Sequence, residues 1–160
     1  MMSCGGNAPN EELITKANEQ SNQKITAKVI NDFDYTDFAL SAEAEKELSG
    51  WEKYKELAIQ ISYLKKADLS FFNGDRELLN EFLIEFKEGL PKEFNTNPIQ
   101  SRLTILETKI LKLHDNLTLD NIDLNLQLES IKEVLQAFSN LNYRIDKKLE
   151  FDIYNEITPE

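Results

Sequence analysis

Cysteine and histidine are almost absent from this 160-residue chain, which contains one of each, Cys4 and His114. A single cysteine excludes a disulfide within the chain and a zinc site built from several thiolates. A single histidine excludes any site that needs two imidazoles. Glycine and proline are scarce, at 5 and 4 residues. Few helix breakers in a chain rich in Leu, Glu, Lys and Ile favour long helices.

Basic side chains are also few, with 18 Lys and Arg against 29 Asp and Glu, for a net charge of -11. Because a nucleic-acid-binding protein must neutralise phosphates, this charge argues against nucleic acid as a partner. It equally opposes direct adsorption to an anionic membrane, and no apolar run approaches the roughly 20 residues of a membrane span. The charge favours solubility and a basic or neutral partner.

The chain begins Met1-Met2-Ser3-Cys4-Gly5-Gly6-Asn7, which resembles the end of a bacterial lipoprotein signal of the Bacteroidota type. In that signal a small residue, here Ser3, precedes an acylated cysteine, and small polar residues follow it. The basic start and apolar stretch of a signal peptide are missing, so the resemblance implies a signal upstream of Met1. It also implies a lipid anchor on Cys4 in the cell envelope, facing the periplasm or the cell surface. The alternative is a cytoplasmic protein with an ordinary cysteine.

The pattern of polar and apolar residues divides the chain into four parts. Residues 1–24 are polar with little apolar periodicity, which predicts a flexible tether carrying Cys4. Residues 25–40 predict an extended strap, and residues 41–151 predict a bundle of helices. Residues 152–160 predict a frayed acidic tail.

The strap is predicted from period-two alternation, in which Phe33, Tyr35 and Phe38 alternate with acidic side chains. A lone extended segment cannot form a sheet, yet these aromatics are too apolar for a tether. We therefore expect the strap to pack on the bundle near the first helix. There it could cover a groove as a lid, or be displaced by a segment of a partner.

The first two helices are marked by caps and a turn. The first is predicted over roughly residues 42–73, with Ser41 as its N-cap and Gly50 as the point of a bend or restart. The second is predicted over roughly residues 76–88, with Asp75 as its N-cap. Gly89 is predicted to end it as a left-handed C-terminal cap.

The third helix is predicted to begin at Asn97 as its N-cap, with Pro98 in the first turn. The fourth is predicted from Asp120 or Asn121 to about Phe151. The third carries the most regular apolar stripe, formed by Ile99, Leu103, Leu106, Ile110, Leu113 and Leu117. Four such stripes with short connections predict an all-α fold, an antiparallel four-helix bundle with an N-terminal extended strap.

Polar residues within the stripes are the candidates for chemistry. Asn142 interrupts the row of the fourth helix, where a polar residue favours one helix register. Glu107 and His114 lie two turns apart on one flank of the third helix and could bind a metal or move a proton. However, carboxylate bundles use Glu-x-x-His on more than one helix, and this chain has none. We therefore predict no metal ligands and no cofactor.

Motifs for catalysis are missing from the sequence, which contains no phosphate loop, no Gly-x-Ser-x-Gly and no Cys/His nucleophile pair. The resulting hypothesis is a non-enzymatic helical-bundle lipoprotein of the cell envelope, acting as a binding or structural module. Its partner would be an unidentified protein or small ligand, and only the lipid anchor would reach the membrane. The alternative is a soluble helical bundle that binds a small ligand or a metal ion. The candidate binding surface comprises Phe33, Tyr35, Phe38, Trp51, Tyr54, Glu107 and His114.

Overall fold

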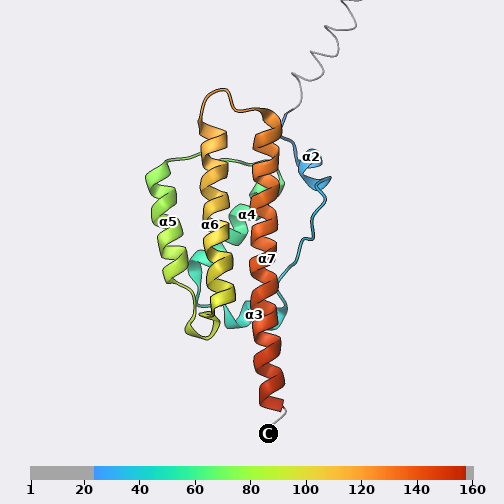
Figure 1. The fold of residues 1–160 in the computed structure, drawn as a ribbon, viewed down its shortest axis with the longest axis vertical. Helices are drawn as coiled ribbons and strands as arrows, with labels where there is room; N and C mark the ends of the chain where they lie inside the picture. Colours follow the sequence, from blue (N-terminus) through green and yellow to red (C-terminus); the bar gives the residue numbers. More distant parts are fainter. Residues whose placement is uncertain (1–23, 158–160) are drawn as a thin grey trace, which may run out of the picture.

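The computed structural model describes residues 24–157, and every regular element within them is helical (Figure 1). The all-α fold class is confirmed. Residues 1–23, which include Cys4 and nearly all of the predicted tether, lie outside the described residues, as do residues 158–160. The elements are α2 (Ala27–Asn31), α3 (Ala42–Glu47), α4 (Glu52–Lys65), α5 (Arg76–Glu88), the 3-10 turn η1 (Lys92–Phe94), α6 (Asn97–Thr118) and α7 (Leu124–Ile157).

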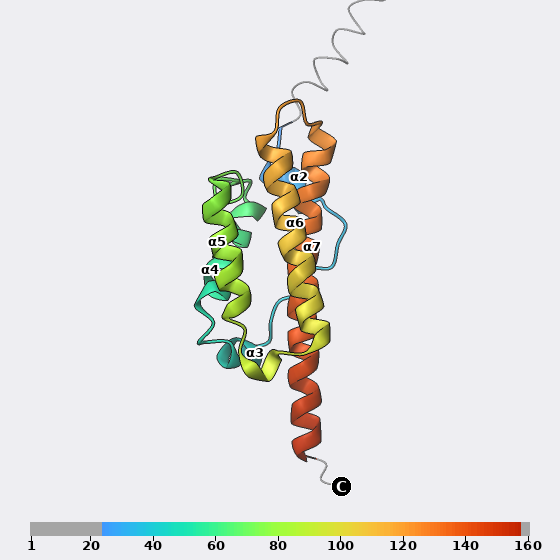
Figure 2. The same ribbon diagram turned by 60° about the vertical axis from the view of Figure 1, so that its left-hand side comes forward.

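The four longer helices, α4 to α7, run alternately up and down around a single core (Figures 1 and 2). Helices α6 and α7 lie side by side as a hairpin, and α4 and α5 form the second pair. The regular stripe of α6 is buried as predicted from Ile99 to Leu113, whose five members are at most 1% exposed, whereas Leu117 at its end is only partly buried. Burial of these rows is the main stabilising term of the bundle.

The predicted first helix is two helices joined at a bend near Gly50. Helix α3 begins after the Ser41 cap and ends before Leu48, and α4 begins after Trp51. Leu48 and Trp51 are both buried, so the bend lets two large side chains enter the core close together. The predicted end at residue 73 was wrong. Helix α4 stops at Lys65, and Ala67 follows in the left-handed region with φ 65°.

Of the four predicted caps, two are present, one is wrong, and Gly89 is the C-cap of α5 but without the predicted conformation. The side chains of Ser41 and Asp75 accept hydrogen bonds from the backbone of their first turns, as predicted. Asn97 is the first residue of α6 rather than its cap, which is Thr96. Gly89 has φ −77° and is not left-handed. A Cβ at this position would lie 2.8 Å from Cδ1 of Trp51, so glycine is required here for space.

Helix α7 begins later and ends later than predicted. It starts at Leu124, after a connection in which Asn121 has a left-handed φ of 60°. It continues to Ile157, so the predicted frayed tail after Phe151 is helical as far as the description reaches. The last turns extend beyond the end of the other helices (Figures 1 and 2).

The predicted strap is extended only in part. Residues Ala27–Asn31 form the short helix α2, whose N-cap Thr26 accepts a hydrogen bond from the backbone N–H of Val29 at 3.2 Å. The β-branched residues there had favoured an extended chain, but the cap and the burial of Ile30 favour a helical turn. The chain from residue 32 to Ser41 then runs along α7 without regular structure (Figure 1).

Candidate functional site

A row of buried polar side chains on α7 binds the strap. Ser139, Asn142 and Asp146 are spaced by three and four residues, which places them on one face of the helix. The hydroxyl of Ser139 accepts from the N–H of Phe38 at 2.7 Å and donates to the carbonyl of Thr36 at 2.6 Å. The strap's backbone groups therefore find partners without a neighbouring strand.

Asn142 and Asp146, the other two residues of this row, extend the contact between α7 and the strap. We call the contact made by Ser139, Asn142 and Asp146 the seam. Asn142 donates to the carbonyl of Phe38 at 3.1 Å and accepts from the hydroxyl of Tyr54 at 2.5 Å. Asp146 accepts from the N–H of Ser41 at 3.0 Å and from its hydroxyl at 2.6 Å. These bonds hold the second half of the strap, from Thr36, and the Ser41 that follows it against α7.

The aromatic side chains of the strap serve this packing. Phe33 and Tyr35 are partly buried against the core, and burial, with the charge of Asp37, raises the pKa of the Tyr35 phenol. Phe38 meets the ring of Tyr143 edge-on at 5.4 Å. All three candidate surface residues are thus half-buried, Phe33 and Tyr35 against the core and Phe38 against the exposed ring of Tyr143.

Trp51 and Tyr54 are both core residues, and Tyr54 also lines a surface groove of 320 Å³ beside Leu48 and Ala58. Trp51 is 1% exposed, and its indole N–H donates to the carbonyl of Phe86 at 2.8 Å. The ring of Tyr54 stacks on that of Phe138, with the two ring centroids 5.7 Å apart. Burial is the main cause that raises the pKa of the Tyr54 phenol far above its usual range, with smaller contributions from Glu45 and Asp146.

Glu107 and His114 are not brought together in a site, because each binds a different part of the chain. Glu107 pairs with Lys87 of α5 at 2.7 Å. His114 is buried, with Nε2 2.9 Å from the carbonyl of Gly74. A carbonyl can only accept, so Nε2 donates this bond. Among the described residues, no group of three or more His, Cys, Asp or Glu could hold a metal, and no helix is long and apolar enough to cross a membrane.

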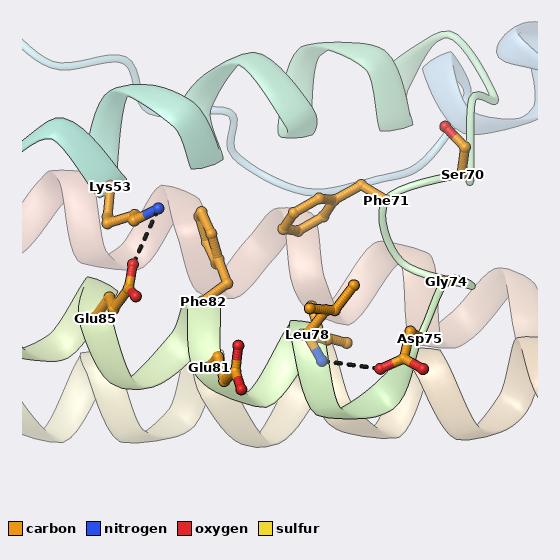
Figure 3. Close-up of a pocket in the computed structure, with 10 residues that line it drawn as sticks. Lys53, Ser70, Phe71, Gly74, Asp75, Leu78, Glu81, Phe82 and Glu85 are labelled. Atoms are coloured by element: carbon orange, nitrogen blue, oxygen red, sulfur yellow. Dashed lines mark hydrogen bonds and ion pairs between the residues drawn. The ribbon is translucent and has the colours of Figure 1, made fainter.

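A surface groove of 390 Å³ lies between α4, the connection after it, and α5 (Figure 3). Its walls include the rings of Phe71 and Phe82, which meet edge-on at 5.0 Å. The acidic side chains that line it are Asp75, Glu81 and Glu85, against one cation, that of Lys53. An aromatic wall with an acidic rim favours a positively charged occupant.

One end of this α4–α5 groove already holds an ammonium group, that of Lys53. Its Nζ lies 3.1 Å from a carboxylate oxygen of Glu85 and 3.3 Å from one of Glu56. The same atom lies 5.2 Å from the centroid of the Phe82 ring (Figure 3). Hydrogen bonds to Glu85 and Glu56 raise the pKa of the Lys53 ammonium above its usual range. The groove thus has the geometry of an ammonium site, formed by carboxylates and a ring face.

The opposite end of the groove is shaped by the turn between the helices. Asp75 lies there, and its carboxylate accepts from the N–H of Leu78 at 3.0 Å (Figure 3). Ser70 also lines this end and donates from its hydroxyl to Asp68 at 2.6 Å, which lowers the pKa of that carboxyl. The hydrogen bond from Nε2 of His114 to the carbonyl of Gly74 joins this turn to α6.

Comparison of the chain with protein-family models, with curated proteins and with solved structures finds no match. The function therefore has to be argued from the site itself.

Sequence reasoning missed most of this site. The sequence marks Phe82 only as one of the apolar residues of the predicted helix 76–88. Lys53 and Glu85 belong to two different helices, so no local spacing marks their pairing. The seam on α7 did leave a signal. Ser139 and Asp146 flank Asn142 at helical spacing, and reading polar rows as well as apolar ones would have found all three.

Proposed function

We propose that this protein is a non-enzymatic helical-bundle module of the cell envelope, anchored by a lipid on Cys4, that captures a basic segment of a protein partner in the α4–α5 groove. The observation that carries the proposal is the position of the Lys53 ammonium, over the Phe82 ring and beside Glu85. The contacts of the Lys53 ammonium support a groove that suits cationic groups. A lysine or arginine of a partner would occupy the same kind of position.

The strength of each contact indicates a segment rather than a small amine. An exposed cation over a ring contributes about 0.5–1 kcal/mol, and an exposed ion pair contributes at most about 1 kcal/mol. One ammonium would therefore bind at best at about millimolar concentration. Several basic residues along the groove would add up to a useful affinity, and the net charge of -11 would steer them toward the surface.

The groove is tested with a synthetic tetralysine peptide and two double variants of equal net charge. Glu81→Gln with Glu85→Gln removes two carboxylates that line the groove, whereas Glu77→Gln with Glu88→Gln removes two exposed carboxylates of α5 that do not line it. We expect the peptide to shift the amide resonances of residues 70–85 and the first variant to bind about fivefold more weakly than the second. Equal losses would show general charge attraction and overturn the proposed site.

A small-amine control separates the proposal from its alternative. Butylammonium carries the same cationic group as lysine but spans only one position. If it binds the groove as tightly as the peptide does, a small-ligand function replaces the partner segment proposed here.

The lipid anchor is tested by cell fractionation. The full reading frame, with any codons upstream of Met1, is expressed beside its Cys4→Ala variant. We expect the unaltered protein in the membrane fraction and the variant outside it. Both proteins in the cytosol alone would exclude the anchor.

A further inference from the structure

The turn between α4 and α5 contains the pair Asn73-Gly74, an asparagine followed directly by a glycine. No other asparagine of the chain precedes a glycine. Both residues are exposed and lie outside the helices, and Gly74 lines the α4–α5 groove (Figure 3). Because glycine has no Cβ to shield its backbone nitrogen, that nitrogen can closely approach the side chain before it. At this pair a backbone nitrogen therefore meets the least hindrance in reaching the amide of the preceding asparagine.

The structure leaves the nitrogen of Gly74 available for reaction. Among residues 24–157, the N–H of Gly74 donates no hydrogen bond, whereas the N–H of Asn73 donates to the carbonyl of Leu69 at 3.0 Å. The side-chain nitrogen of Asn73 can donate to the carbonyls of Ser70 at 3.2 Å and Leu69 at 3.3 Å. Only these two bonds, both made by an exposed side chain, have to open before the amide can turn toward Gly74.

We propose that Asn73-Gly74 is a site of spontaneous deamidation through a cyclic imide. The backbone nitrogen of Gly74 loses its proton to solvent and forms a bond to Cγ of Asn73. The bond from Cγ to the amide nitrogen breaks, and that nitrogen takes up a proton and leaves as ammonia. Water then opens the imide. Cleavage of the new bond to Cγ gives aspartate, and cleavage of the original peptide bond gives isoaspartate, whose backbone runs through Cβ and Cγ. Water is the only co-reactant, and nothing is oxidised or reduced.

The two products change the turn in different ways. Both add a carboxylate at position 73, next to the residues Gly74 and Asp75 that line the groove. Isoaspartate also lengthens the backbone before Gly74, whose carbonyl accepts from Nε2 of the buried His114 at 2.9 Å. Isoaspartate should therefore break the link between this turn and α6, whereas aspartate should keep it. The added charge should strengthen the attraction of the groove for a cationic segment. That effect on binding rests on the proposed function, and the deamidation itself does not.

The reaction is tested by peptide mapping and mass spectrometry of the full chain after incubation at mildly alkaline pH. We expect conversion of amide to acid at Asn73, in two products that chromatography separates. The rate should rise with pH because the nitrogen of Gly74 must lose its proton. Asn140 is also exposed but lies within α7 and precedes a leucine, so it is the internal control and should stay unchanged.

The matched variant is Gly74→Ala, which should fold like the unaltered protein. Gly74 does not have a left-handed φ, and a Cβ there would meet the carbonyl oxygen of Ser70 at 3.4 Å, an ordinary contact. The added methyl group shields the nitrogen, so conversion at Asn73 should slow severalfold. No conversion at Asn73 in the folded chain would overturn the proposal. Equal rates in Gly74→Ala and in the unaltered protein, or equal rates at Asn73 and Asn140, would overturn it as well.

The effect on the groove is tested with Asn73→Asp, which carries the aspartate product alone. It should bind the tetralysine peptide about twofold more tightly than Asn140→Asp, which adds the same charge on α7. Equal affinities of the two variants would exclude this effect. If the unaltered protein does not bind the peptide in the groove at all, the proposed function fails. The mass spectra would then still decide whether Asn73 deamidates.

Discussion

Replacing Asn142 with alanine should detach the strap from α7 and lower the free energy of unfolding. The change removes two hydrogen bonds at once, one to the carbonyl of Phe38 and one from the hydroxyl of Tyr54. A buried polar group left without a partner costs about 1–3 kcal/mol. Tyr54 lies in the core and would lose its partner, whereas the strap carbonyl can regain water. Together, the loss of the two hydrogen bonds should lower the free energy of unfolding by about 3 kcal/mol. This corresponds to a fall in melting temperature of about 6–12 °C.

The matched control is Asn140→Ala, two residues away on α7 but exposed. Urea unfolding gives the stability of both variants, and amide exchange reports on the strap itself. The N–H groups of Phe38 and Ser41 donate to the neighbouring Ser139 and Asp146, so they should exchange faster only in Asn142→Ala. Equal stability of the two variants, or unchanged exchange at both amides, would refute the account of the seam.

Three further predictions follow from glycine, tyrosine and the strap. Gly89→Ala should cost about 1–3 kcal/mol in urea unfolding because its Cβ would meet an indole ring at 2.8 Å, whereas Gly50→Ala, with nothing within 4 Å, should not. The raised pKa of the Tyr54 phenol stabilises the fold below about pH 10 and loses that contribution as pH rises further, since the unfolded chain then ionises first. Tyr54→Phe should therefore flatten the decline of stability above that pH, and Tyr63→Phe, an exposed change, is the comparison. A chain that begins at Ser41 should melt below one that begins at Lys24, and equal melting temperatures would make the strap only a linker.

The helices could be predicted because their burial follows the helical period. Ile99 to Leu113 repeat every three or four residues, and one core buries the whole row. Ser41 and Asp75 were recognisable because a cap acts on its own first turn. The end of α4 was missed because no sequence rule required Ala67 to take a left-handed conformation.

The site could not be predicted in the same way because its contacts join distant parts of the chain. Lys53 meets Glu85 across 32 positions, and the partner of each polar residue depends on which helices become neighbours. Gly89 shows the same limit. Its sequence position correctly suggested the C-cap of α5, but nothing near it in the sequence showed that it also leaves room for Trp51, which lies 38 positions earlier.

The central claim is that the α4–α5 groove is a site for a partner's cationic group and that Lys53 now occupies it. The most direct test is the affinity of the tetralysine peptide for Lys53→Ala and Lys55→Ala, which remove the same charge from the same helix. Lys55 pairs with Glu52 at 3.4 Å and does not line the groove, whereas Lys53 pairs with Glu85 inside it. If Lys53 occupies the site, its removal should raise the affinity about fivefold more than the removal of Lys55. Equal affinities, or weaker binding by Lys53→Ala, would contradict the claim.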